Sequence, residues 1–113
     1  METIKGLKRT DYCGDLNIKD CGREVTLFGW AQRQRDLGNL IFIDMRDRTG
    51  IVQLSFSDKT SRETFEKAAA VRSEYVLAVK GKVVERESKN PELPTGEIEI
   101  EVFELRRSEE RRV

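Results

Sequence analysis

The sequence contains no histidine, and it has only two cysteines, Cys13 and Cys21, among its 113 residues. Histidine is the commonest general base in enzymes, and two thiols without histidine make a poor zinc site. Disulfides are rare in reducing compartments, so we expect both thiols to be free or packed. Neither a glycine-rich phosphate loop nor a Gly-x-Ser-x-Gly turn occurs. The chain by itself is therefore predicted to be no enzyme and to need no metal or cofactor.

Long hydrophobic runs are also missing, since none approaches the roughly 20 residues that cross a bilayer. The first ten residues are polar and contain no signal-peptide core, which predicts a cytoplasmic protein with no membrane partner. The 21 basic and 21 acidic residues balance to a formal net charge of zero. A non-specific duplex binder is normally strongly basic, so this balance argues against that class. A small site for single-stranded RNA remains compatible with it.

One aromatic residue lies on the polar face of a predicted strand at residues 40–47. Because side chains in a strand alternate between two faces, Ile41, Ile43 and Met45 share one face. Asp44 and Arg46 share the other face, and Phe42 lies with them. A ring among charged groups can stack on the base of a single-stranded nucleic acid. The alternative is that the strand is buried on both faces and Phe42 only packs.

The order of elements predicts an all-β fold. We expect strands at residues 25–32, 40–47, 51–56, 75–85 and 97–102, with Gly29 marking a bulge or tight bend. Thr60 and Glu63 have capping-box spacing and predict a helix that ends near Ser73, with a stripe of Phe65, Ala68, Ala69 and Arg72. Five strands with a helix between the third and fourth match the OB-fold, a small Greek-key β-barrel. We expect an N-terminal arm (1–14) that lies on the surface or frays, the barrel (15–105) and a charged tail (106–113).

Ligands of an OB-fold lie across its second and third strands, between the loops that join strands one to two and four to five. We expect Arg35 on the first of these loops and Arg86 and Asn90 on the second. The amide of Gln53 can meet the Watson–Crick edge of an unpaired pyrimidine, and the carboxylate of Glu99 can accept two hydrogen bonds from guanine. The arginines could instead form surface ion pairs. The glutamates could instead be charges that keep the edge of a sheet from aggregating, which applies above all to Glu97 and Glu101. The predicted RNA-binding residues are Arg33, Arg35, Phe42, Gln53, Arg86, Asn90 and Glu99. Phe28, Trp30 and Phe56 are assigned to the core, and a second stacking ring is the alternative for Trp30.

The run from Arg33 to Gln53 closely resembles one known family. It is similar to the N-terminal anticodon-binding domain of bacterial aspartyl-tRNA synthetases. The segments Tyr12-Cys13-Gly14, Val25-Thr26-Leu27 with Gly29-Trp30, and Thr95 to Glu99 fit the same family. Gln34 departs from it, since arginine is usual there, and Ser55 stands where an aromatic residue often occurs. The tail at 106–113 does not resemble the usual hinge.

The resemblance implies a role for each candidate residue. Phe42 would stack on the central uridine of the aspartate anticodon, and Arg35 and Gln53 would bond the second and third bases. Glu99 would accept hydrogen bonds from the first-position guanine or its queuine derivative, and Arg86 and Asn90 would contact the backbone of the anticodon loop.

Three functions remain open at this stage. The first is recognition of the aspartate tRNA anticodon without catalysis, because the class II motifs of the synthetase are not in this sequence. The second is general binding of single-stranded nucleic acid. The third is a protein-interaction or dimerisation barrel that uses the edge at residues 97–101 or the charged tail, and we expect the isolated chain to be a monomer or a weak homodimer.

Overall fold

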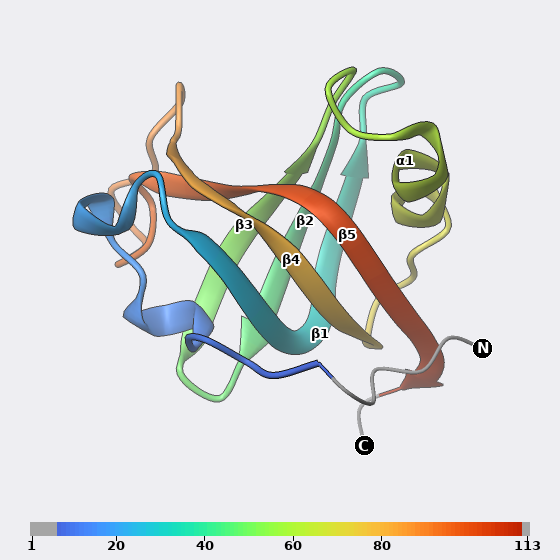
Figure 1. Cartoon of the computed structure of the whole chain (residues 1–113), viewed down its shortest axis with the longest axis horizontal. Coiled ribbons are helices and arrows are strands. Elements are labelled where there is room, and N and C mark those ends of the chain that lie inside the picture. The colour runs from blue at the N-terminus through green and yellow to red at the C-terminus, as the bar shows by residue number, and fades with distance from the viewer. Residues whose placement is uncertain (1–6, 112–113) are drawn as a thin grey trace.

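A computed structural model describes residues 7–111, and the side chains of residues 7–108. Five strands close into a barrel in the order β1-β2-β3-β5-β4 (Figure 1). Neighbouring strands are antiparallel except β3 and β5, which are parallel. The elements are η1 (Cys13–Asp15), η2 (Ile18–Asp20), β1 (Glu24–Asp36), β2 (Ile41–Asp47), β3 (Gly50–Phe56), α1 (Arg62–Ala69), β4 (Tyr75–Glu85) and β5 (Ile98–Arg111). This is the predicted five-stranded OB-fold with one helix.

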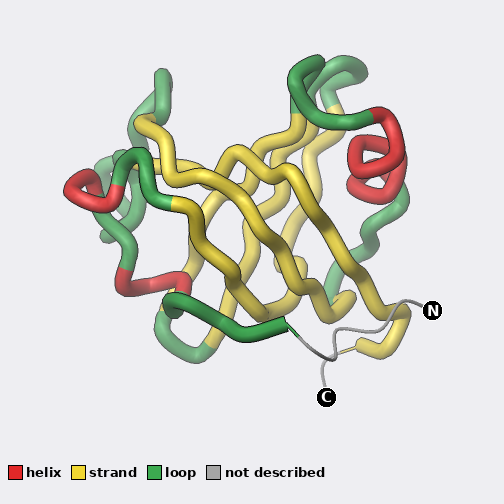
Figure 2. Tube along the Cα trace, in the orientation of Figure 1, coloured by secondary structure: helices red, strands yellow, loops and turns green. Residues whose placement is uncertain are grey.

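Alternation along the strands places one hydrophobic core inside the barrel. Ile41, Ile43 and Met45 of β2 are fully buried, whereas the residues between them are only partly buried. The other strands also contribute inward residues, including Leu54, Leu77 and Ile100 (the remaining core residues of these strands are Val25, Leu27, Ala31, Val52, Phe56, Val79, Val83, Ile98, Val102 and Leu105). The strands form a continuous wall with loops at its ends (Figure 2). The wall has a buried and an outer face, as predicted from the alternation of side chains between the two faces of a strand.

The helix begins one residue later and ends earlier than the sequence predicts. Ser61, not Thr60, is the N-cap, and its hydroxyl accepts a hydrogen bond from the Thr64 backbone N–H. α1 ends at Ala69 because a tight turn follows and the Gln34 side-chain amide binds the carbonyls of Ala68 and Ala69, each at 3.0 Å. The predicted stripe is correct for Phe65 and Ala68 but wrong for Ala69 and Arg72, which are exposed.

Two strands extend further than predicted. β1 continues to Asp36, so Arg33 and Arg35 lie on a strand and not on a loop. A bulge falls between Ala31 and Arg33, while Gly29 marks a close approach: a Cβ there would lie 2.3 Å from the Arg46 carbonyl oxygen. β5 was expected to stop at residue 102, but it pairs with β4 as far as Arg111. The part of the expected tail at 106–111 is therefore strand, and residues 112–113 lie outside the described residues.

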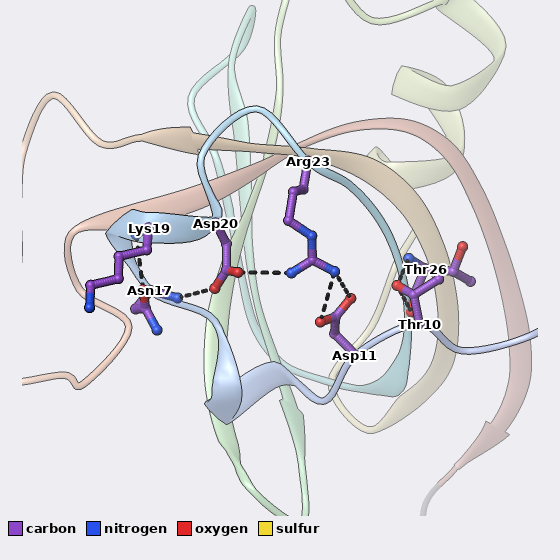
Figure 3. Close-up of polar contacts among 7 residues, drawn as sticks. All are labelled: Thr10, Asp11, Asn17, Lys19, Asp20, Arg23 and Thr26. Carbon is purple, nitrogen blue, oxygen red and sulfur yellow. Dashed lines mark hydrogen bonds and ion pairs between the residues drawn. The ribbon is translucent and has the colours of Figure 1, made fainter.

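The N-terminal segment is held against the barrel. Arg23 bonds Asp11 at 3.0 Å and Asp20 at 2.8 Å, and Thr10 bonds Thr26 at the start of β1 (Figure 3). Cys13 is fully buried. Lys8, Arg9 and Thr10 are exposed, so this part of the segment lies on the surface of the barrel and is bonded to it, and residues 1–6 lie outside the description.

A buried carboxylate joins this segment to the β2–β3 turn. Asp47 accepts hydrogen bonds from the backbone N–H groups of Cys13 and Thr49, each at 2.8 Å. Burial would raise the pKa of Asp47, but these bonds and one from the Thr49 hydroxyl outweigh burial and hold the pKa below its usual value. Burial and the neighbouring carboxylate raise the pKa of the Cys13 thiol. Both cysteines are free thiols, as predicted, with Cys21 exposed.

Candidate nucleic-acid interface

A cavity of about 510 Å³ lies on the outer face of the barrel, over β2, β3 and β5. It is bounded by the residue before β2, the start of the loop after β4 and residues that follow β3. Five of the seven predicted RNA-binding residues line it: Arg35, Phe42, Gln53, Arg86 and Glu99. The side chains therefore come from β1, β2, β3, β5 and the β4–β5 loop and meet at one place.

Phe42 occupies the middle of this surface. It is partly buried and faces outward between Ile41 and Ile43, which are fully buried. In the β2–β3 ladder its partner is Ser55, which lines the same cavity. Because serine is small, the Phe42 ring is not covered by a bulky neighbour from β3 at this position. The alternative that β2 is buried on both faces is wrong.

A chain of hydrogen bonds joins three polar residues that line the cavity together with Phe42. Arg35 Nη2 donates to Gln53 Oε1 at 2.9 Å, and Gln53 Nε2 donates to Glu99 Oε1 at 2.9 Å. The Arg35 guanidinium also lies 5.1 Å from the centroid of the Phe42 ring. Gln53 is only 6% exposed, whereas Glu99 is partly exposed. The chain crosses the site from β1 to β5.

Arg86 is the first residue after β4, and its backbone N–H donates to the Glu97 carbonyl at 2.9 Å. Its side-chain Nε is buried, and it has no hydrogen-bond partner among the described residues. Arg86 also lines the cavity, and a planar guanidinium suits the oxygens of phosphates and bases. Arg86 can therefore act as an anion or base contact at this rim of the cavity.

The structure does not bring the other two predicted residues into the cavity. Arg33 is exposed and lies opposite Asp44 in the β1–β2 ladder. The Asn90 side-chain oxygen accepts from the Glu92 N–H at 3.0 Å, so it closes a turn inside the β4–β5 loop. The loop is tight there, since a Cβ on Gly96 would lie 1.7 Å from the Asn90 carbonyl oxygen. Asn90 thus shapes the loop that carries Arg86.

Nine lining residues were not among the predicted site residues, and Leu40, Lys59 and Glu101 are three of them. Leu40 precedes Phe42 by two positions, and Glu101 follows Glu99 by two, so period-two alternation could have placed both on the same outer face. Lys59 follows β3 in a turn, where the sequence gives no direction for its side chain. Glu101 was interpreted as edge protection, but it lines the cavity, whereas Glu97 is exposed outside it.

The charge of the cavity is mixed. Its lining contains four carboxylates (Glu85, Glu87, Glu99 and Glu101) and three cations (Arg35, Lys59 and Arg86). Carboxylates repel phosphates but accept hydrogen bonds from base N–H groups. The site is therefore suited to select bases and is poorly suited to attract any nucleic acid without discrimination.

The assignment of Trp30 and Phe28 to the core is wrong, whereas Phe56 is fully buried as predicted. Trp30 and Phe28 are partly buried on the outside of β1 and line a second cavity of about 400 Å³ with Tyr12. The guanidinium groups of Arg9 and Arg48 lie 4.1 and 4.9 Å from the centroid of the Tyr12 ring.

No helix in residues 7–111 is both long and apolar enough to span a bilayer. In the same part of the chain, no three His, Cys, Asp or Glu residues gather as a metal site would require.

Comparisons with known proteins identify the family to which this fold belongs. Residues 25–107 match the tRNA anti-codon family model, which is described as an OB-fold nucleic acid binding domain. The aspartate–tRNA(Asp/Asn) ligase of Caldanaerobacter subterraneus subsp. tengcongensis is 59% identical over 101 residues, and the aspartate–tRNA ligase of Clostridium tetani is 52% identical over 100. Each match covers 88% of this chain and 17% of the relative, so the chain spans about a sixth of their length.

Among solved structures, asparaginyl-tRNA synthetase from Pyrococcus horikoshii superposes with a TM-score of 0.75 and 33% sequence identity. The match covers 88% of this chain and 23% of that one. The chain therefore belongs to the tRNA anti-codon family of OB-fold nucleic acid binding domains, and it corresponds to that domain of the bacterial aspartyl-tRNA ligases.

Proposed function

We propose that this domain recognises the anticodon loop of the aspartate tRNA and performs no catalysis by itself. The observation that carries the proposal is that Phe42 and its polar neighbours Arg35, Gln53 and Glu99 share one cavity on the ligand-binding wall of an OB-fold. The ligase activity named for the relatives would reside outside the stretch that they share with this chain. The cytoplasm follows as the location, because the proposed partner is a tRNA that is charged there.

Each residue takes a role that fits its chemistry. The Phe42 ring would stack on the central uridine, since an unpaired base offers a flat apolar face. Arg35 and Gln53 would hydrogen-bond the second and third bases, and Glu99 would accept hydrogen bonds from the first-position guanine. Arg86 would contact the backbone of the anticodon loop, since it lines the cavity and its guanidinium suits phosphate oxygens.

The two residues outside the cavity take different roles in this proposal. Arg33 is exposed on the same strand as Arg35 and would meet a phosphate at the margin of the loop. Asn90 would act indirectly, because its side chain closes the turn in the loop that carries Arg86. Substituting Asn90 by alanine would therefore loosen the β4–β5 loop. RNA binding by Arg86 would weaken, and proteases would cleave the loop more readily.

The proposal is tested with short RNA hairpins that carry the aspartate anticodon loop. Fluorescence anisotropy would compare this hairpin with one in which the first-position guanine is adenine, and with one whose loop sequence is scrambled. We expect the matched hairpin to bind best and Glu99→Gln to reduce the preference for guanine. Glu97→Gln is the matched control, because Glu97 is exposed outside the cavity. Equal affinity for the matched and scrambled hairpins would overturn the proposal.

The alternative functions receive less support from the geometry. A general single-strand binder would be poorly served by a cavity with more carboxylates than cations. β5 pairs with β4 and, at Ile100 and Glu101, with β3, so the stretch at 97–101 is not a free sheet edge there. We expect sedimentation of the chain to show a monomer or at most a weak dimer.

A further inference from the structure

The side-chain amide of Gln53 is engaged at both of its ends. Its oxygen accepts from Arg35 at 2.9 Å and its nitrogen donates to Glu99 at 2.9 Å. A guanidinium is only a donor and an ionised carboxylate is only an acceptor. Rotating the amide by half a turn would place N–H groups against the guanidinium and the oxygen against the carboxylate. Only one of the two amide orientations is therefore compatible with these neighbours.

This restriction matters because a glutamine whose amide can rotate does not distinguish uracil from cytosine. Uracil presents a donor at N3 beside the acceptors O2 and O4, whereas cytosine presents a donor at N4 beside the acceptor N3. Held against the edge of a pyrimidine in one pose, an amide that can rotate could match either base by exchanging its oxygen and nitrogen. An amide that cannot rotate matches only one of them.

Gln53 keeps capacity for such a contact while the chain of bonds is intact. An amide oxygen has two lone pairs and an amide nitrogen has two hydrogens, and Arg35 and Glu99 use one of each. One acceptor site and one donor site remain, in directions set by the backbone of β3 and by the two charged neighbours. Gln53 lines the cavity beside Phe42, where the proposed function places the central base.

We propose that Arg35 and Glu99 are positioning residues for Gln53, in addition to any contacts of their own, and that they fix which pyrimidine Gln53 accepts. The inference rests on the proposed recognition of the anticodon loop. Its consequence is that the preferences at different anticodon positions are coupled, because one amide is held by residues at both ends of the site. Changing Glu99 then alters discrimination at a base that Glu99 does not touch.

Glu99→Gln is the diagnostic variant, since glutamine has nearly the same shape and can either accept or donate. It removes the requirement that Gln53 present its nitrogen on that side. We expect unaltered protein to bind the hairpin with a central uridine about tenfold more tightly than one with a central cytidine. In Glu99→Gln we expect this ratio to fall to about threefold or less, with the thermal unfolding midpoint unchanged. Glu97→Gln removes the same charge outside the cavity and should keep the full ratio.

A double variant separates coupling from simple damage. Gln53→Met removes the amide but keeps a side chain of similar length, so it should abolish the uridine preference. Adding Glu99→Gln to Gln53→Met should then cause no further change in the uridine-to-cytidine ratio. A further independent loss in the double variant would show that Glu99 acts on the central base by another route and would overturn the inference.

The outcomes distinguish this inference from the proposed function. If unaltered protein binds matched and scrambled hairpins equally, the proposed function fails and the inference fails with it. If it prefers the matched hairpin but Glu99→Gln retains the whole uridine preference, only the positioning role is wrong. In the free protein, the side-chain amide resonances of Gln53 should shift in Glu99→Gln and stay in place in Glu97→Gln. Gln53 amide resonances that do not shift in Glu99→Gln would also contradict the proposed fixed orientation of that amide.

Discussion

Removal of the Phe42 ring is the most direct test of the candidate interface. Stacking of one base on an aromatic ring contributes about 1–3 kcal/mol. In the free domain, the Arg35 guanidinium already lies 5.1 Å from the ring centroid, and a cation in that position contributes about 0.5–1 kcal/mol at an exposed site. A base that displaces the guanidinium gains only the difference. We therefore expect Phe42→Ala to weaken binding of the anticodon hairpin by about 1–2 kcal/mol, which is about 5- to 30-fold.

Fluorescence anisotropy with a labelled hairpin measures this loss, and urea unfolding shows whether the variant is folded. Every base has a flat π face, so the loss should be similar for matched and mismatched loops. Phe103→Ala is the matched control, because Phe103 is 49% exposed on β5 and does not line the cavity. If Phe42→Ala and Phe103→Ala bind the hairpin equally well, the ring is not a stacking platform and the reasoning from strand alternation to function is wrong.

Three other outcomes follow from particular contacts. Asp47→Ala leaves the buried Cys13 N–H without its acceptor and should lower the free energy of unfolding by about 3 kcal/mol. Because the pKa of Asp47 is lowered in the fold, this loss of stability should be complete above about pH 4 and should shrink as the pH falls. A loss of stability that does not change with pH would contradict this prediction. Gln34→Ala should cost about 1 kcal/mol in thermal unfolding by exposing the C-terminus of α1, with RNA affinity unchanged. With three cations in the cavity, the slope of log affinity against log salt should be near −2, and a slope beyond −4 would place most phosphate contacts elsewhere.

The faces of the strands could be predicted from the sequence because alternation is a local property. Ile41 and Ile43 point inward and Phe42 outward for a geometric reason that needs no tertiary information. The same argument placed Gln53 and Glu99 on the outer face. Once the element order indicated an OB-fold, the topology brought β2, β3 and β5 side by side, and the site followed from these two facts.

The parts that were wrong depend on contacts between distant segments. Arg35 was placed on a loop because the first strand was expected to end at residue 32, but pairing with β2 extends β1 to Asp36. The helix end could not be predicted, because Gln34 satisfies its last carbonyls from 34 residues away. β5 continues past residue 105 because β4 offers it a partner. Trp30 looked like a core residue by size alone, although its position in β1 places it outside the barrel.

The charge of the cavity decides what kind of binding this domain can provide. Four carboxylates around three cations cannot supply the counterion release that drives strong, sequence-independent binding. The same carboxylates leave a wrong base with unmatched polar groups, and an unpaired buried donor or acceptor costs about 1–3 kcal/mol. In the proposed function, stacking on Phe42 would favour any base, whereas Glu99 and the held amide of Gln53 would penalise most of them. Affinity and selectivity would then come from different residues, and substitutions at Phe42 and Glu99 should change one without the other.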